Sequence, residues 1–457
     1  MGGRSDAQGS PLLPEEARTV TESRAEARHP KGLYVLFFTE LWERFGFYTM
    51  IAIFTLYMKA PRAEGGLGLD TATAGSFYAL FMGLVYFTPL LGGLAADLLI
   101  GMRWAITIGA VFLGAGYFVL SAPPSDDLVL LYVAMGSIVI GNGLLKPNIS
   151  TMVGRLYSED SPLRDAGFNI FYTGINLGAL VAPAAAAFLR TRWSWQAAFA
   201  AAGVGMIASL ITFVTLSRHY RDADKPKEKK VDPSRDAGKA DGVSSGHRIL
   251  ALMILLVVST MFWTLFFQNG FALTLWADEC TTRPDWLTPE LFQMVNPVCI
   301  VLLSSSAAWV WSRLGKAGKE PTTPSKILMG LAVSAVACLV MVGASYAGGD
   351  SCADGIRVSM MWLVSTYVFI SLAEILVSPM GLSYCTQIAP GKLGGLVMGG
   401  WFASLAAGGY LSGWMGGRLW ESLPHSTYFL ILVVGMAAVS VLLFAVRGVL
   451  DRASGAR

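Results

Sequence analysis

Charged residues are scarce in this chain. They make up 14% of its 457 residues, whereas a soluble protein carries about a quarter. Apolar residues account for 54% of the sequence, and lipid is the solvent that suits such a composition. The deficit of charge therefore excludes an ordinary soluble globular protein and predicts an integral membrane protein.

Cysteine and histidine are also few, and their positions argue against several kinds of chemistry. The five cysteines include no Cys-x-x-Cys pair and no pair with the spacing of zinc ligands, so we expect no metal or redox centre. Cys280 and Cys352 fall in two predicted loops on the same side of the membrane. A disulfide is one interpretation of that pair, and two unrelated loop cysteines is the interpretation that we favour. The sequence shows no nucleophile triad, which argues against an enzyme.

Apolar runs long enough to cross a bilayer, about twenty residues each, occur twelve times. The first six predicted spans are Leu33–Met58, Thr73–Leu99, Ala105–Ser121, Leu128–Val153, Phe168–Leu189 and Gln196–Leu216. The second six are Ile249–Trp276, Leu291–Trp311, Ile327–Tyr346, Met360–Tyr384, Leu396–Trp414 and Thr427–Val446. The predicted organisation is a disordered cytosolic tail (1–30), a six-helix bundle (31–217), a polar cytosolic linker (218–248), a second bundle (249–447) and a cytosolic tail (448–457).

The positive charges are distributed unevenly between the two sides of these spans. Of the 34 lysines and arginines, 25 fall on the side of the two termini and 7 on the other. Because cytoplasmic loops carry the excess of Lys and Arg, both termini are predicted to be cytoplasmic in a multi-pass protein of the cell membrane. The lysine run of the linker is read as part of this orientation signal, and no nucleic-acid partner is expected.

Five charged residues lie within the predicted spans, away from their ends: Glu40, Glu43, Arg44, Lys146 and Glu374. A charge at the bilayer centre costs about 2.5–3.5 kcal/mol, and it usually faces a water-filled cavity or another charge. The first three lie at i, i+3 and i+4 and therefore share one helical face. No histidine lies in any predicted span, so a proton carried through the protein has to bind a carboxylate. The pattern indicates a functional site inside the membrane.

Four motifs in chain order resemble those of the proton-dependent oligopeptide transporters. They are FFTELWERFGFY (Phe37–Tyr48), GNGLLKPN (Gly141–Asn148), FNIFYTGINLGAL (Phe168–Leu180) and AEILVSPMGLSY (Ala373–Tyr384). Weaker matches follow in FWTLFFQNG (Phe262–Gly270), LFQMVNP (Leu291–Pro297) and MGGWF (Met398–Phe402). The resemblance implies an all-α integral membrane protein of the major facilitator fold. Its twelve transmembrane helices would form 6+6 bundles that rock around a central site.

The resemblance also implies roles for individual residues. Glu40, Glu43 and Arg44 match the proton-coupling motif, with the proton as coupling ion and no other cofactor. Arg44 and Lys146 would bind the carboxylate of a peptide, and Glu374 would bind its amine. The remaining residues implied in substrate binding are Tyr48, Tyr86, Asn176, Trp263, Asn296 and Trp401.

Phe267 departs from the family pattern, in which a carboxylate usually stands at this place in the seventh span and faces the lysine of the fourth. The expected function is proton-coupled symport of di- and tripeptides by a monomer in the lipid bilayer. Two alternatives stay open. The missing acid favours a transporter of the same fold that carries another small anion or an amino-acid conjugate, and the third interpretation is a non-transporting membrane sensor.

Overall fold

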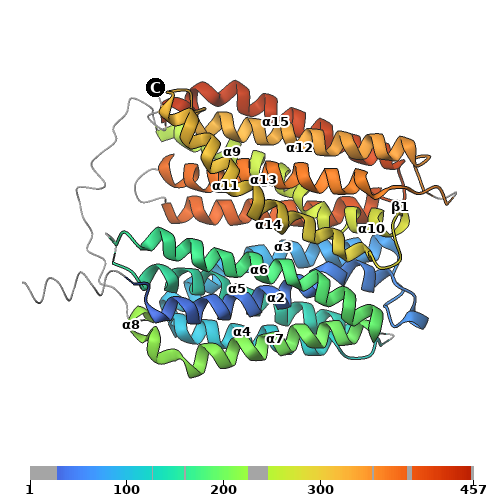
Figure 1. Ribbon diagram of the computed structural model, residues 1–457, viewed down its shortest axis with the longest axis horizontal. Coiled ribbons are helices and arrows are strands. Elements are labelled where there is room, and N and C mark those ends of the chain that lie inside the picture. The colour runs from blue at the N-terminus through green and yellow to red at the C-terminus, as the bar shows by residue number, and fades with distance from the viewer. Residues whose placement is uncertain are drawn as a thin grey trace, which may run out of the picture.

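Long helices that run side by side dominate the computed structural model (Figure 1). It describes residues 28–125, 127–158, 161–224, 245–352, 355–388 and 394–453. Most of the predicted tails and of the linker lies outside these residues. Ten of the described helices are long and apolar enough to cross a membrane. Two more, α2 with 29 residues and α14 with 26, are equally long and complete the twelve predicted spans.

The first half of the chain forms one group of helices, drawn blue to green in Figure 1. Its elements are α2 (Lys31–Lys59), η1 (Arg62–Glu64), α3 (Thr71–Ala95), η2 (Ala96–Ile100), α4 (Met102–Leu120), α5 (Val129–Arg155), α6 (Arg164–Arg192), α7 (Trp195–Thr215), η3 (Ser217–His219) and α8 (Arg221–Asp224). Side chains cap two of the helices: Asp70 accepts a hydrogen bond from the Thr73 amide at 2.9 Å, and Ser194 accepts one from the Ala197 amide at 3.2 Å. Helix α2 packs against α6 and α7.

The second half forms the other group, drawn yellow to red in Figure 1. Its elements are α9 (Ser245–Phe266), η4 (Phe267–Gly270), α10 (Ala272–Glu279), β1 (Thr281–Thr282), η5 (Pro289–Met294), α11 (Val295–Lys316), α12 (Thr323–Ala347), β2 (Val358–Ser359), α13 (Met360–Ile388), α14 (Gly394–Leu419) and α15 (His425–Ala453). All twelve predicted spans overlap these helices or those of the first half, and the predicted fold class is confirmed.

The seventh span is broken, although its sequence predicts one continuous helix. Helix α9 ends at Phe266, a short 3-10 turn follows, and α10 resumes the crossing. Side chains of the other half bind two of the carbonyl groups at this break. The Tyr78 hydroxyl donates to the Phe267 carbonyl at 3.0 Å, and the Thr55 hydroxyl donates to the Gly270 carbonyl at 2.5 Å. Irregular backbone at membrane depth persists where neighbouring groups satisfy it in this way.

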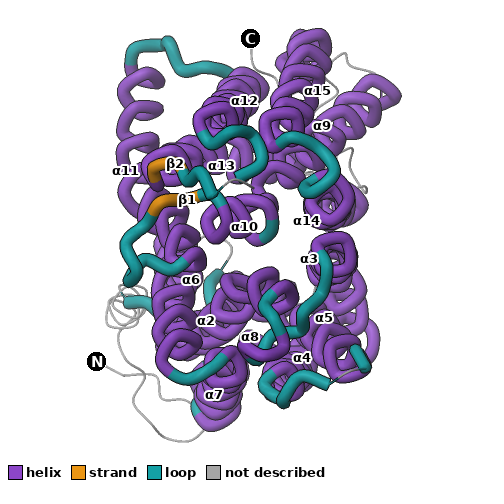
Figure 2. The backbone as a smooth tube through the Cα atoms, turned by 90° about the vertical axis from the view of Figure 1, so that its right-hand side faces the viewer, coloured by secondary structure: helices purple, strands orange, loops and turns teal. Residues whose placement is uncertain are grey.

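The two halves lie against each other along α3 and α14, which are neighbours in Figure 2. Small residues allow this approach. A Cβ atom on Gly409 would lie 2.9 Å from Cβ of Met82, and one on Gly417 would lie 3.0 Å from Cα of Gly75. We call the end of the molecule that holds β1, β2 and η1 the strand end, and the end that holds α8 and the C-terminus of α15 the linker end (Figures 1 and 2).

Cys280 and Cys352 form a disulfide at the strand end, with their Cα atoms 5.3 Å apart. The favoured interpretation of two unrelated loop cysteines is therefore wrong. The two residues are 72 positions apart in sequence, and tertiary structure brings them together: β1 pairs in parallel with β2, and the Cys280 carbonyl accepts a hydrogen bond from the Val358 amide at 2.9 Å.

Candidate functional site

A cavity of about 280 Å³ lies between the two halves, at the depth of the broken helix. Nine of the residues predicted for proton coupling or substrate binding line it: Glu40, Arg44, Tyr48, Tyr86, Lys146, Asn176, Trp263, Asn296 and Glu374. Both halves contribute to this lining, six residues from α2, α3, α5 and α6 and three from α9, α11 and α13. The structure thus brings residues from seven helices around one space.

Arg44 is held by acidic and polar side chains of its own half. Its guanidinium donates two hydrogen bonds to the Glu43 carboxylate, from Nε and from Nη2, and Nη2 also donates to Oδ1 of Asn142 at 3.2 Å. The Glu40 carboxylate lies 3.6 Å from Nε. Glu40, Glu43 and Arg44 are each at most 2% exposed. Because a buried charge is tolerated when it is paired and hydrogen-bonded, this network explains how α2 holds three charges inside the bundle.

One acidic oxygen of this network is left over. Oε2 of Glu40 is buried and has no hydrogen-bond partner among the residues that the structure describes. Glu40 itself lines the cavity. A buried carboxylate oxygen without a partner is costly, and a proton or a ligand donor reaching it from the cavity would remove that cost.

Lys146 and Glu374 are the charged groups of the lining that no ion pair neutralises, as far as the described residues show. The Lys146 ammonium lies 5.2 Å from the centroid of the Tyr86 ring, a cation–π contact. On the other half, Oε2 of Glu374 accepts a hydrogen bond from the Asn296 amide at 2.8 Å. The cavity therefore has a positive group on α5 and a negative group on α13, in opposite halves.

Aromatic rings of both halves also line the cavity. The ring of Phe267 lies 5.0 Å from that of Tyr86 and stacks on Trp263 at 5.5 Å. Tyr86 belongs to the first half and the other two rings to the second. At the place where the family usually has an acid, this chain therefore has an apolar contact between the halves.

Two of the predicted residues lie outside the lining. Glu43 is fully buried behind Arg44, which it binds. Trp401 is 4% exposed, and its ring fills the space beside Gly381 in which a side chain would have to lie. Among the lining residues, Asn176 donates its side-chain amide to the Tyr172 carbonyl at 3.0 Å, one turn earlier in its own helix.

Sequence reasoning missed two amides at the site. Asn142 binds Arg44 and also donates to the Val85 carbonyl at 2.8 Å, so it joins α2, α3 and α5. Gln293 lines the cavity and donates to the Ala52 carbonyl of the other half at 3.3 Å. The spacing of Asn142 contained a usable signal, because it lies four residues before Lys146 and hence on the same helical face.

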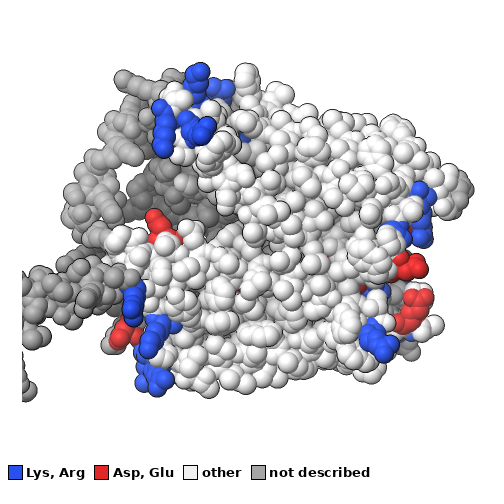
Figure 3. Space-filling model, viewed as in Figure 1, with Lys and Arg blue, Asp and Glu red and all other residues white. Residues whose placement is uncertain are grey.

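Ion pairs join the two halves at the strand end, where charged residues gather at the right of Figure 3. The Lys59 ammonium lies 3.2 Å from the Glu279 carboxylate and 3.5 Å from that of Glu421. Beside them, Arg190 of α6 donates two hydrogen bonds, at 2.9 and 3.1 Å, to the fully buried carboxylate of Glu290. The ion pairs that join a described residue of one half to a described residue of the other all lie at this end, and they hold it closed over the cavity.

Comparison with known proteins gives consistent results over most of the chain. A model of the POT family matches residues 103–236 and 231–419. An uncharacterized transporter of Bacillus subtilis, YclF, is 32% identical over 88% of this chain and 90% of its own. The dipeptide and tripeptide permease A of Chromobacterium violaceum is 31% identical over 87% of both chains. The peptide transporter YePEPT of Yersinia enterocolitica is 29% identical over 93% of this chain and 96% of its own.

Solved structures agree with the sequence relatives. A crystal structure of a peptide transporter POT in complex with sulfate has a TM-score of 0.83 at 30% identity, over 93% of this chain and 96% of that one. A POT family transporter in complex with 5-aminolevulinic acid has a TM-score of 0.82 at 26% identity, over 92% and 97% of the two chains.

Proposed function

The chain belongs to the POT family of transporters, and from this premise we propose that it is a symporter that couples the uptake of di- and tripeptides to protons. It is an integral membrane protein and a transporter rather than an enzyme. What we propose beyond this is the substrate, the coupling ion and the direction of transport.

The observation that supports a peptide substrate is the separation of two unpaired opposite charges across one cavity. A short peptide is a zwitterion whose termini lie roughly 5–10 Å apart, by the reach of an extended chain. Its carboxylate would bind Lys146, beside Arg44, and its ammonium would bind Glu374. A ligand bound in this way contacts both halves, so its binding favours the state in which they close around it.

The way in which Arg44 is held supports coupling to protons. In this structure Glu43 neutralises the guanidinium. A proton on Glu43 removes that negative charge, and Arg44 is then free to bind the ligand's carboxylate. The unpartnered oxygen of Glu40 lines the cavity and gives a proton arriving by that route a place to bind. Proton and peptide would therefore bind cooperatively, which is the requirement for symport.

The strand end is assigned to the outside of the cell. Lysine and arginine are concentrated in the segments that continue from the linker end, where the first and last described residues lie, and the cytoplasmic side of a membrane protein carries this excess. The disulfide at the strand end supports the same orientation, because disulfides persist in oxidising compartments outside the cytosol. The structure would then be closed toward the outside.

A second candidate is a transporter of small organic anions. The contact that favours it is the one between Phe267 and Tyr86, which leaves Lys146 with an aromatic partner and no carboxylate among the described residues. An anion needs this positive pole and makes no use of Glu374. Competition between ligands separates the two candidates.

Uptake by purified protein in liposomes tests the proposal. With an acidic outside and a neutral inside, labelled Ala-Ala should accumulate above its outside concentration, and a protonophore should abolish the accumulation. An excess of other di- and tripeptides should compete, whereas N-acetylated peptides and small anions should compete weakly. Accumulation that is insensitive to the protonophore would contradict proton coupling, and competition by anions alone would favour the second candidate.

A further inference from the structure

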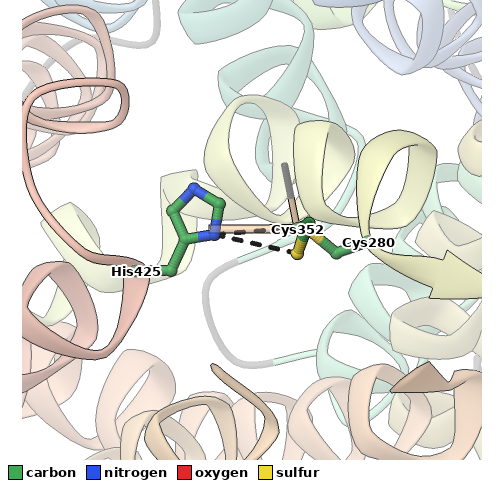
Figure 4. Close-up of side chains that lie close together, drawn as sticks. All are labelled: Cys280, Cys352 and His425. Carbon is green, nitrogen blue, oxygen red and sulfur yellow. Dashed lines mark hydrogen bonds between the residues drawn. A yellow bond between two sulfur atoms is a disulfide. The ribbon is translucent and has the colours of Figure 1, made fainter. Parts of the chain in front are cut away.

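The disulfide between Cys280 and Cys352 lies next to His425 in a compact cluster at the strand end (Figure 4). Nδ1 of His425 is 4.0 Å from Sγ of each cysteine. Cysteine and histidine side chains at such distances also bind zinc. Here the two sulfurs are bonded to each other, and a disulfide offers no thiolate to a cation. The cluster is therefore a cross-link, and its role depends on what it holds in place.

One of its neighbours is the start of α15. Asp350, two residues before Cys352, accepts hydrogen bonds from the Ser426 amide at 2.6 Å and from the Ser426 hydroxyl at 2.7 Å. Its carbonyl accepts the His425 amide at 2.9 Å. Both Asp350 and Cys352 have positive φ angles, 70° and 53°. Non-glycine residues persist in this region only where surrounding structure holds them, and the disulfide and the start of α15 do so here.

The other neighbour is the strand-end ion-pair group, by which we mean Lys59, Glu279 and Glu421. Glu279 directly precedes Cys280. One oxygen of its carboxylate binds Lys59 of the other half at 3.2 Å, and the other accepts a hydrogen bond from the Trp420 indole at 3.4 Å. That indole stacks on His425, with ring centroids 4.1 Å apart. Glu279 is therefore connected to the disulfide in two ways. It directly precedes Cys280 in the chain, and its carboxylate contacts the Trp420 ring, which stacks on His425.

Exposure explains why such support matters. The side chains of Lys59 and Glu279 are 23% and 38% exposed. An ion pair of this exposure contributes little on its own, partly because two flexible side chains must be ordered to form it. Support that fixes one partner in advance reduces this cost. A carboxylate held in place by a cross-link therefore makes a stronger contact between the halves than a free one.

We propose that the Cys280–Cys352 disulfide positions Glu279 for Lys59 and thereby stabilises the state in which the strand end is closed. Cys280, Cys352, His425 and Trp420 act as positioning residues, whereas Glu279 makes the contact. The proposal rests on the proposed function only in treating opening of the strand end as a step of the transport cycle. Its test needs no substrate, so it can fail or succeed independently of peptide transport.

The test measures the separation of the two halves at the strand end. Nitroxide labels on Ala63→Cys and Trp286→Cys, two exposed positions in opposite halves, report the opening as a longer distance in pulsed electron spin resonance. The protein is reconstituted in lipid nanodiscs, with the three free cysteines replaced by serine. Replacing Cys280 and Cys352 together by serine should lower the ratio of closed to open molecules about two- to fivefold, the size expected for an ion pair of this exposure.

Glu279→Gln decides whether the disulfide acts through Glu279. Alone it should lower the ratio by a similar factor, and the combined variant should show no further loss, because the two changes remove one contact. Asp278→Asn is the matched control, since its carboxylate pairs with Arg283 of the same half at 3.1 Å, and it should leave the ratio unchanged. The proposal would be overturned by an unchanged ratio of closed to open molecules when Cys280 and Cys352 are both replaced by serine. Effects that multiply in the combined variant would overturn it as well.

Two further perturbations cover the case in which the variant without Cys280 and Cys352 fails to fold. Trp420→Phe keeps an aromatic ring on His425 and removes the indole donor to Glu279, so it should lower the ratio in the same direction. Dithiothreitol added to folded, labelled protein, with labels attached by a linkage that thiols do not cleave, reduces the disulfide to two thiols while the reagent becomes a cyclic disulfide. It should reproduce the shift, and removal of the reductant with reoxidation should reverse it. An unchanged ratio of closed to open molecules in the Trp420→Phe variant, or on reduction of the disulfide, would also refute the proposal.

Discussion

Glu374→Gln tests the assignment of the two poles of the cavity. One Glu374 oxygen accepts a hydrogen bond from the Asn296 amide at 2.8 Å, and the carboxylate forms no ion pair with a described residue. Glutamine keeps the size and shape of the side chain but removes its charge. If the ammonium of a peptide binds this carboxylate, the substitution removes a charge-assisted hydrogen bond worth about 1.5–3 kcal/mol. That loss corresponds to about 10- to 150-fold weaker binding, since each 1.4 kcal/mol is about tenfold.

Isothermal titration calorimetry with two ligands makes this test specific. Ala-Ala carries the ammonium and N-acetyl-Ala-Ala lacks it. The substitution should weaken binding of Ala-Ala by the stated factor and leave the affinity for the acetylated peptide nearly unchanged. Glu320→Gln is the control, because this carboxylate pairs with Lys326 at 2.5 Å and does not line the cavity. Equal losses for the two ligands, or no loss for Ala-Ala, would refute the role given to Glu374.

Three other substitutions have distinct expected outcomes. Glu43→Gln should abolish proton-driven accumulation but leave exchange of labelled for unlabelled peptide, measured by counterflow in liposomes; accumulation at the wild-type level would contradict the coupling scheme. Glu290→Gln removes the charge that binds Arg190 between the halves, so the strand-end labels should report more open molecules, by at least about fivefold, because even an exposed pair contributes up to about 1 kcal/mol and this carboxylate is fully buried; an unchanged distance distribution would count against this contact. Asp70→Ala should lower the thermal unfolding temperature at neutral pH through loss of a helix cap worth about 0.5–2 kcal/mol. Hydrogen bonds from Thr73 lower the pKa of Asp70, so its stabilisation is present above the pKa of the unfolded chain, about 3.9, and is lost as the pH falls through the lower folded value; a wild-type advantage that persists below that value would contradict the assignment.

The charged residues of the site could be predicted from the sequence because lipid makes them conspicuous. In apolar spans, Glu40, Arg44, Lys146 and Glu374 are each costly unless a cavity or a partner receives them. That argument needs no knowledge of which helices are neighbours. It predicted that the charges belong to one functional site, and the structure places these four around one cavity.

Other features could not be predicted, because they depend on contacts between distant segments. The break at Phe267–Gly270 has no charge and no proline to mark it, and it is stabilised by hydroxyl groups of the other half. Asn142 and Gln293 are neutral amides, whose presence in a span costs much less than that of a charge, so their roles did not stand out. The disulfide depends on a two-residue strand pairing that no local pattern announces.

The glycine-lined contact between α3 and α14 limits which side chains the boundary between the two halves can accept. At Gly409 the nearest atoms of the other half are the Cβ, C and O atoms of Met82, and at Gly417 they are backbone atoms of Ala72 and Gly75. Backbone cannot turn aside as the end of a long side chain can, so a larger residue at either position has to push α3 and α14 apart. Such a residue is therefore expected to weaken the contact between the halves, although neither glycine lines the ligand cavity.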